Sequence, residues 1–473
     1  MNAAVTRGHW HIPWLHGVPS HWEVVSSKQL FSARKELARE HDQQLSATQA
    51  YGVINQKDFE RRVGRRVVQI TQNLEKRRHV EKDDFIISMR SFQGGLERAW
   101  ETGCIRSSYV VLKPSPRVDA GFFQYLFKSC DYIQALQATS NFIRDGQDLN
   151  MSNFSLVDLP LPPLDEQRLI ARFLNWHGAQ TAKLIRTKKK LIALLNEQKQ
   201  AIIHRAVTRG LDPNVRLKPS GISWIGDVPE GWEVVPLKRI TLSRCDGPFG
   251  SGLKSSHYSS SGVFVVRLQN IGVGEFVRKD KVFISREHYS TLGDHSVLSN
   301  DLLVASLGDE VRPCGRACLS PIDLGEAMVK ADCFRFRLDT ERVCPAFMAA
   351  HLTATARESS AILSAGATRQ RVNLEATAQR AVTLPSLEEQ NQILEWISSA
   401  TQNVDKGVAI TEREILLIQE LRARLIADVV TGKLDVRKIA ATLPDSAEDQ
   451  PIEDASDEDD FDEKDAESEE AAA

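Results

Sequence analysis

The sequence contains no long hydrophobic run. Its most apolar stretches, such as residues 262–266 and 302–305, have the length of β-strands, whereas a membrane-spanning helix needs about 20 apolar residues. The first residues also lack the apolar segment of a secretory signal. We therefore expect a protein that stays in the cytoplasm.

Cysteine is scarce, and its spacing matches no common metal or disulfide pattern. The seven cysteines are an odd number without a Cys-x-x-Cys pair. They lie at positions 104, 130, 245, 314, 318, 333 and 344. Cys314 and Cys318 are close in sequence, but no histidine accompanies them at ligand spacing. We expect reduced thiols, as in cytoplasmic proteins, and no metal site.

Acidic residues are few in the body of the chain and concentrated at its end. Residues 441–473 contain 15 Asp or Glu and one Lys, a charge of −14, so residues 1–440 carry +11 within a total of −3. A basic body with an acidic tail suggests a nucleic-acid partner. A soluble body with a solubilising tail explains the charge alone equally well. The tail composition predicts disorder over residues 438–473.

The sequence repeats itself once. Residues 18–25 (VPSHWEVV) return as 228–235 (VPEGWEVV), and residues 162–167 (PPLDEQ) return as 385–390 (PSLEEQ). Two anchor motifs about two hundred residues apart exclude a solenoid, whose repeats are about 20–50 residues long. The organisation is predicted as a globular domain over 1–163, a long helix over 164–210, a second domain over 211–386 and a second long helix over 387–437.

Each predicted helix has a heptad pattern of mostly apolar positions, and the two helices are each other's natural partners. In the first helix these positions are Ile170, Leu174, His177, Thr181, Leu184, Lys188, Leu191, Leu195, Gln198 and Ile202. In the second they are Ile393, Ile397, Ala400, Val404, Gly407, Thr411, Glu414, Ile418, Leu421 and Leu425. The globular halves have short β-branched and aromatic runs with helical stretches between them, which predicts mixed α/β (α+β) domains.

These motifs together resemble the specificity (S) subunit of type I restriction–modification systems. The repeated openings and helix entries carry the resemblance, with residues 246–252 (DGPFGSG) and 366–373 (GATRQRVN). The resemblance covers residues 12–437. It implies two target-recognition domains joined by two long antiparallel helices that form a coiled coil, in a pseudo-twofold internal repeat.

The resemblance also implies a role in host defence. Each recognition domain would read one half of a bipartite site in double-stranded DNA, and the chain would be a non-catalytic scaffold. Its partners would be two methyltransferase subunits, which use S-adenosylmethionine to methylate adenine N6, and two restriction subunits, which use ATP and Mg²⁺. No cofactor is expected on this chain itself.

The motifs of catalysis are incomplete. Residues 159–163 (LPLPP) have the prolines of an adenine-methyltransferase loop, but neither the preceding Asn nor the following aromatic residue. In residues 247–255, Leu253 separates the last glycine from Lys254, whereas a P-loop needs the lysine directly after that glycine. That segment is instead predicted to be a turn whose backbone N–H groups meet a DNA phosphate. The acidic residues 81–84 fit a solvated turn better than a nuclease site.

The residues best suited to DNA are the Arg, Lys, Gln, Asn and Ser side chains of loops, which contact phosphates and base edges. The candidates are Arg61, Arg62, Arg65, Arg66, Arg77, Arg78, Arg90, Ser91, Gln93, Ser251, Lys254, His257, Tyr258, Arg267, Gln269, Asn270, Arg312, Arg316, Arg369 and Arg371. Candidates for subunit interfaces are Trp22, Leu184, Leu191, Leu195, Trp232, Ile418, Leu421 and Leu425. Two alternatives stay open: a coiled-coil interaction scaffold that reads no DNA, and a stand-alone DNA methyltransferase or nuclease.

Overall fold

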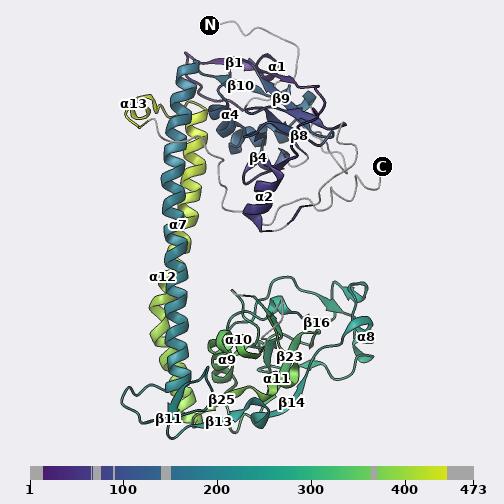
Figure 1. The fold of residues 1–473 in the computed structure, drawn as a ribbon, viewed down its shortest axis with the longest axis vertical. Helices are drawn as coiled ribbons and strands as arrows, with labels where there is room; N and C mark the ends of the chain where they lie inside the picture. Colours follow the sequence, from purple (N-terminus) through teal and green to yellow (C-terminus); the bar gives the residue numbers. More distant parts are fainter. Residues whose placement is uncertain are drawn as a thin grey trace. The chain divides into compact units, whose positions relative to one another are not determined.

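The computed structural model describes residues 14–64, 66–67, 76–88, 91–139, 151–309, 311–363 and 370–444 (Figure 1). The chain forms two compact units: unit 1 contains residues 1–189 and 413–473, and unit 2 contains residues 190–412. Each unit combines one predicted α/β half with part of both long helices, α7 (Leu164–Arg209) and α12 (Leu387–Val430). The first helix has nearly the predicted bounds, whereas α12 ends seven residues before the predicted residue 437.

Unit 1 is built on short antiparallel strands. Its main sheet has the order β2 (Phe31–Ala33), β9 (Val110–Pro114), β6 (Phe85–Ile87) and β7 (Glu97–Arg98). Three two-stranded pairs accompany it: β1 (Glu23–Ser26) with β10 (Asp158–Leu161), β3 (Leu45–Thr48) with β4 (Gly52–Asn55), and β5 (Arg78–Val80) with β8 (Gly103–Ile105). The β1–β10 pair joins the two ends of the globular half directly before α7 begins.

Several helices of unit 1 begin at recognisable capping residues. They are α1 (Ser27–Leu30), α2 (Gln56–Val63), α3 (Ser91–Gly94), α4 (Ala120–Phe127), α5 (Cys130–Gln137) and α6 (Met151–Phe154). Asn55 caps α2 by accepting a hydrogen bond from the backbone nitrogen of Lys57, and Gly64 ends the helix in the left-handed conformation at φ 69°. Asp119 and Ser129 cap α4 and α5 in the same way as Asn55.

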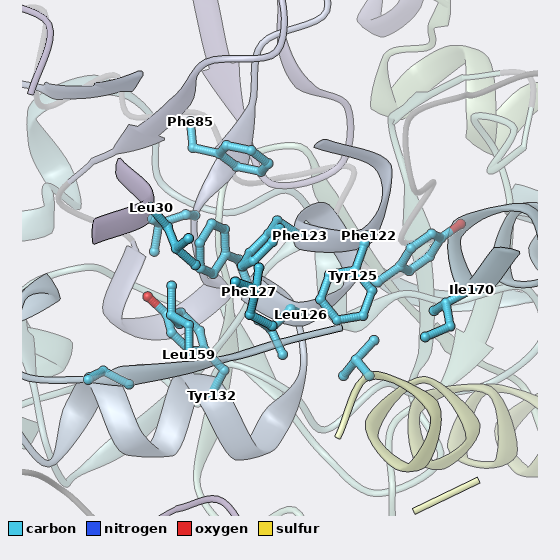
Figure 2. Close-up of a cluster of buried hydrophobic side chains, with 14 of the residues drawn as sticks. Leu30, Phe85, Phe122, Phe123, Tyr125, Leu126, Phe127, Tyr132, Leu159 and Ile170 are labelled. Atoms are coloured by element: carbon cyan, nitrogen blue, oxygen red, sulfur yellow. The ribbon is translucent and has the colours of Figure 1, made fainter. Parts of the chain in front are cut away.

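Helix α4 carries the aromatic core of unit 1 (Figure 2). Phe122, Phe123 and Phe127 are fully buried. The ring of Phe31 lies 5.4 Å from those of Phe123 and Phe127, and Phe85 lies 5.0 Å from Phe127. Most of these pairs meet edge to face, the arrangement that aromatic quadrupoles favour.

The described part of unit 2 contains more strands, most of them in a four-stranded and a five-stranded sheet. One has the order β14 (Thr241–Cys245), β23 (Cys333–Leu338), β19 (Leu302–Ala305) and β21 (Ala317–Leu319). The other has the order β15 (Tyr258–Ser259), β17 (Phe283–Ile284), β16 (Val263–Val266), β22 (Ala327–Val329) and β18 (Ser296–Val297), with β16 and β22 parallel. The pairs are β11 (Leu217–Pro219) with β12 (Asp227–Pro229), β13 (Glu233–Pro236) with β25 (Ala381–Leu384), and β20 (Leu307–Gly308) with β24 (Gln370–Arg371).

Apart from α7 and α12, the described α-helices of unit 2 have five to ten residues. The α-helices are α8 (Arg286–Ser290), α9 (Pro345–Ala354), α10 (Ala356–Leu363) and α11 (Leu374–Gln379). The 3₁₀ turns are η2 (Leu237–Ile240), η3 (Gly250–Gly252), η4 (Ser255–His257) and η5 (Leu268–Asn270). Pro345 occupies the first turn of α9, where its missing N–H costs no hydrogen bond. The buried Phe347, Met348 and Leu352 of α9 share a core with Phe334 and Phe336 of β23.

Helices α7 and α12 run antiparallel in each unit. In unit 1, Lys188 Nζ donates to Glu414 Oε2 at 2.6 Å, and the guanidinium of Arg422 lies beside Gly178. In unit 2, Lys199 Nζ donates to Asp405 Oδ1 at 2.6 Å. The antiparallel direction therefore agrees with the prediction.

The heptad positions predicted from the sequence are wrong at alternate sites. Ile185 is 5% exposed while the predicted Leu184 is 46% exposed, and in α12 Ile415 is 9% exposed while Leu421 is 65% exposed. In both helices, every second predicted residue belongs to the buried seam. At the positions between them, the buried residue is the one that comes directly after the predicted residue. Both phases are nearly equally apolar in the sequence, so contact with the partner helix decides between them.

The segment after α12 remains folded for several residues. A short helix, α13 (Arg437–Ala440), follows α12, and Ala440 is fully buried. Val436 and Ala440 pack into the core of unit 1. This part of the range 438–473 is therefore ordered, unlike the sequence prediction, and residues 445–473 lie outside the described residues.

Candidate nucleic-acid interface

Helix α2 presents the exposed arginines of unit 1. Arg61 forms an ion pair with Asp58 at 2.9 Å, while its side chain stays 79% exposed. The guanidinium of Arg62 lies over the ring of Tyr51, 5.1 Å from its centroid. Arg66, just after the helix, is also exposed. These side chains keep the freedom that a phosphate contact needs.

Two other candidates of unit 1 are buried and act within the domain. Arg77 is 8% exposed and Ser91 is fully buried. The hydroxyl of Ser91 accepts a hydrogen bond from the backbone nitrogen of Ser88 at 2.9 Å. The next candidate, Gln93, is exposed on the same short helix α3. We therefore read Ser91 as the residue that fixes this turn and Gln93 as the side chain that it presents, while Arg78 is half-buried.

In unit 2 the turn η5 divides its candidates in a similar way. Asn270 is fully buried, and its side-chain oxygen accepts from the backbone nitrogen of Arg267 at 2.9 Å. Its amide donates to the backbone oxygens of Val277 and Lys279. Gln269, next to it, is exposed. Asn270 thus holds the turn in shape. Arg267 beside it is half-buried and donates to the backbone oxygen of Asp280, and the exposed Gln269 donates to Asp280 Oδ2 at 3.2 Å.

Arg316 is a structural residue and not a free cation, contrary to the sequence expectation. It is 4% exposed, and its guanidinium donates to the backbone oxygens of Ile271, Leu307 and Leu268 at 2.8, 2.9 and 3.2 Å. Burial lowers its pKa below the usual arginine value. The sequence gives no sign of this role, because the bonded oxygens of Ile271 and Leu268 lie 45 and 48 residues away.

The glycine turn after β14 is fixed by close backbone packing. A Cβ on Gly247 would overlap the backbone of Lys330, so only glycine fits there. Asp246 Oδ1 accepts from the backbone nitrogens of Gly247 and Asp332 at 2.7 and 3.0 Å. Burial raises the pKa of the Asp246 carboxyl. The turn is therefore a rigid element, and the exposed Lys254 follows Gly247 by seven residues.

Polar side chains from distant segments gather around this turn. Asp332 Oδ1 accepts from Arg371 at 2.7 Å, and the Arg371 side chain remains 55% exposed. Lys330 Nζ donates to the hydroxyl of Tyr258 at 2.8 Å. Lys330 is a residue that the sequence analysis missed, because it lies 72 residues from Tyr258 and belongs to no local motif. Arg312 is exposed on the loop after β20.

A pair of histidines adjoins the same turn. The rings of His257 and His288 lie 4.0 Å apart between centroids. The Nε2 atom of His288 is 3.0 Å from the backbone oxygen of Gly252, and Nδ1 of His257 accepts from the backbone nitrogen of Lys254 at 3.2 Å. His257 is half-buried and therefore helps to shape the turn. Arg65, Arg90, Arg369 and the side chain of Ser251 lie outside the described residues.

The start of α7 is fastened to unit 1 by one glutamine. Gln167 is 1% exposed. Its amide nitrogen donates to the backbone oxygens of Pro162 and Arg117 at 2.9 and 3.0 Å, and its oxygen accepts from the backbone nitrogen of Asp119 at 2.8 Å. All its bonds cross between the helix and the globular part, so the helix entry is fixed to the domain.

Gln390 repeats this arrangement at the start of α12 in unit 2. It is fully buried. Its amide nitrogen donates to Pro385 and Arg342 at 2.9 and 3.2 Å, and its oxygen accepts from the backbone nitrogen of Cys344 at 2.7 Å. The glutamine of the repeated PPLDEQ/PSLEEQ motif therefore does the same work in both units.

Trp22 and Trp232 are buried at the opposite helix ends. They are 7% and 3% exposed. Trp22 shares a core with Val429 and Val430 at the end of α12, and Trp232 shares a core with Ala206 and Val207 at the end of α7. Their own chain therefore covers most of both side chains at the helix ends, and a part for them in a subunit interface stays a prediction.

A cavity of about 150 Å³ adjoins Trp22 in unit 1. The Nε2 atom of His21 lies 2.9 Å from Glu166 Oε2, and Arg437 pairs with Asp435 at 2.7 Å and with Glu166 at 3.7 Å. The hydrogen bond from Arg437 lowers the pKa of Asp435 to about 2. This network ties the segment after α12 to the start of α7.

The other predicted interface residues lie along the helices. Leu184, Leu191 and Leu421 are 46%, 45% and 65% exposed. Leu195, Ile418 and Leu425 are half-buried. The exposed leucines therefore suit contact with another protein chain, whereas the half-buried residues lie nearer the seam.

No three His, Cys, Asp or Glu side chains in the described ranges come together in the manner of a metal site. None of the helices in that part of the chain combines the length and the hydrophobicity that a bilayer crossing requires.

Comparison with known proteins gives the class of the chain. Residues 19–194 match the family model of the type I restriction modification DNA specificity domain, so the first part of the chain carries this domain. The resemblance expected from the repeated motifs is thereby confirmed: the chain is similar to the specificity subunits of type I restriction enzymes.

Individual relatives extend this match over most of the chain. The MjaVIII specificity subunit of Methanocaldococcus jannaschii is 24% identical over 435 residues, which cover 90% of this chain and 96% of that one. The EcoBI specificity subunit of Escherichia coli is 23% identical over 310 residues, 64% of each chain. A solved chain from a study of complex assembly and conformational transition of the type I R-M system covers 89% of this chain and all of its own length, with a TM-score of 0.57 at 14% identity, which supports the mixed α/β fold.

Proposed function

We propose that this chain is the DNA-specificity subunit of a type I restriction–modification complex in the cytoplasm. Each globular half reads one half of a bipartite DNA site, and α7 and α12 form an antiparallel coiled coil in a pseudo-twofold repeat. The single observation that carries the proposal is the identical use of Gln167 and Gln390 at the two helix entries. Two units that join the long helices in the same way but carry different loops suit the recognition of two different DNA half-sites.

The reading surface of unit 1 is the set of exposed side chains Arg61, Arg62, Arg66 and Gln93. That of unit 2 contains Lys254, Arg267, Gln269, Arg312 and Arg371. Arginine and glutamine side chains can pair with base edges in the major groove, and lysine and arginine also contact phosphates. Ser91, Asn270 and Arg316 fix the turns that carry these side chains, which limits the conformational freedom lost on binding.

The chemistry belongs to partner subunits in this proposal. Two methyltransferase subunits supply S-adenosylmethionine-dependent methylation of adenine, and two restriction subunits supply ATP- and Mg²⁺-dependent cleavage. The exposed Leu184 and Leu421 offer a methyltransferase subunit an apolar contact on the helices. Each of these two leucines directly precedes a residue of the observed seam. In an antiparallel pair of helices, such positions of both helices lie on the same side of the pair.

The test is to sequence methylated adenines in cells that express the chain with its partner subunits. We expect one bipartite motif with a fixed gap, which disappears when the chain is deleted. A coiled-coil scaffold that reads no DNA predicts unchanged methylation after deletion. A stand-alone methyltransferase predicts transfer of labelled methyl groups from S-adenosylmethionine by the purified chain alone.

A further inference from the structure

Helix α7 contains a long segment without negative charge. Residues 167–196 include seven Lys or Arg and no Asp or Glu. Like charges three or four residues apart destabilise a helix by about 0.2–0.5 kcal/mol per pair, whereas opposite charges at that spacing stabilise it. A surface helix selected for stability alone would alternate the two signs. The segment therefore suggests a partner that supplies the missing negative charge.

Three of these cations form an exposed face within unit 1. Lys183, Arg186 and Lys189 follow each other at intervals of three residues and are all exposed. No carboxylate in the described residues pairs with any of them, whereas Lys188 between them pairs with Glu414 across the helix seam. At 100° per residue, the three lie on the flank of α7 away from Leu184. We call them the cationic face.

The second long helix has no such face. The repeat aligns Lys183 with Lys406, Arg186 with Ala409 and Lys189 with Glu412. Acidic residues also flank this part of α12, as Asp405 and Glu414. The cationic face is therefore a feature of α7 alone and not a requirement of the helix pair.

We propose that Lys183, Arg186 and Lys189 contact backbone phosphates of the DNA between the two half-sites. This proposal rests on the proposed function, because α7 is the segment of chain that leads from one recognition domain to the other. Lysine and arginine contacts to phosphates carry no sequence information, which suits DNA whose bases are not read. The face spans about 9 Å along the helix, and duplex DNA offers a phosphate about every 1.7 Å of its axis.

The test uses the chain reconstituted with its methyltransferase subunits and a duplex that contains its bipartite site. The variant Lys183→Gln/Arg186→Gln/Lys189→Gln is compared with the control Lys406→Gln/Arg413→Gln/Arg424→Gln, which removes the same charge from exposed positions of α12. Both variants should fold, and thermal unfolding of each variant checks this. We expect the α7 variant to bind about tenfold more weakly at 50 mM salt. Its slope of log affinity against log salt should be shallower by about two to three, at about 0.9 per lost phosphate contact.

Methylphosphonates, which carry no charge, locate the contact on the DNA. Placed between the half-sites, they should weaken the wild-type complex and leave the α7 variant unchanged, and placed outside the site they should affect both equally. Exchanging lysine for arginine, or arginine for lysine, at the three positions keeps the charge and should retain the affinity for DNA. Equal losses in the α7 variant and the α12 control, or an unchanged salt slope, would overturn the proposal.

The acidic segment 441–473 of the same chain is the rival occupant of the cationic face. If removal of residues 445–473 abolishes the difference between wild type and the α7 variant, the face binds that segment and the proposal is wrong. A wild-type complex that prefers no bipartite site would instead refute the proposed function. If the wild-type complex prefers a bipartite site and the α7 variant binds DNA as tightly as wild type, only the phosphate contact is refuted.

Discussion

The two units use the same outer frame around different interiors. Both have a two-stranded pair before the long helix, a buried glutamine at the helix entry and a buried tryptophan at the helix end. Unit 1 fills its interior with aromatic rings around Phe127. Both units also bury ionisable groups, but unit 1 pairs its buried Arg34 with the Asp84 carboxylate at 2.7 Å, whereas unit 2 surrounds Arg316 with backbone oxygens.

The buried charges of unit 2 are held by backbone oxygens. Arg380, 3% exposed, donates to the oxygens of Gly315 and Leu352 and to the hydroxyl of Thr355. Burial lowers the pKa of Arg380 to about 10. Burial, helped by Arg380 and His204, lowers the pKa of His351 to about 3. The comparison teaches that the frame determines how a domain joins the helices, while its interior is free to diverge.

Exchange of one interior should have the largest effect. We expect that replacing residues 27–157, which lie between β1 and β10, with the corresponding segment of another specificity subunit changes one half of the methylated motif completely. The other half should stay the same, because unit 2 keeps its own loops. Sequencing of methylated adenines measures this, and a change in both halves would mean that the units do not read DNA separately.

The aromatic core predicts a large loss of stability confined to unit 1. The substitution Phe127→Ala removes a fully buried ring and should cost about 3–5 kcal/mol of unfolding free energy. Phe127→Leu, which leaves a smaller cavity, should cost less. Hydrogen exchange measured on peptides from each unit separates the two responses, and an equal loss of protection in unit 2 would contradict independent interiors.

The buried histidine predicts acid sensitivity of unit 2. Folded His351 stays neutral down to about pH 3, whereas in the unfolded chain its imidazole takes up a proton below about pH 6.5. The unfolded state binds more protons between these values, so stability falls as the pH is lowered from 6.5, by about 2 kcal/mol at pH 5.

The control is His351→Gln, which removes the titration and leaves an oxygen to accept from the backbone nitrogen of Thr383, as Nε2 of the histidine does. Urea unfolding at pH 7 and pH 5 should show a smaller loss in this variant. An equal loss in wild type and variant would assign the acid sensitivity to other groups.

The helix ends offer the smallest difference between the units. Gly432 and Gly210 both have positive φ, 77° and 73°. A Cβ at Gly432 would overlap Pro19, whereas at Gly210 the nearest atom, Cζ2 of Trp232, would be 3.2 Å away. Gly432→Ala should therefore destabilise its unit by about 1 kcal/mol more than Gly210→Ala, since overpacking adds to the backbone strain. Thermal unfolding of the two variants measures this, and equal shifts would show that Pro19 moves freely.

The sequence by itself determined the duplication, the two long helices and the family. Repeated motifs such as the helix entries at Gln167 and Gln390 need no knowledge of the fold, and proline-free heptad segments are local patterns. The strand-like runs also indicated mixed α/β halves. About half of the candidate DNA contacts whose side chains the structure describes, such as Arg61 and Gln269, are exposed as a reading surface requires.

Only the tertiary structure decided which of two similar faces is buried. Leu184 and Ile185 are equally apolar neighbours, and contact with α12 covers only the second. Arg316 and Arg312 are both loop arginines, but the guanidinium of Arg316 alone is bonded by backbone oxygens of two separate segments, Leu268 and Ile271 in one and Leu307 in the other. Burial depends on which distant segments come together, and residue type and local spacing do not contain that information.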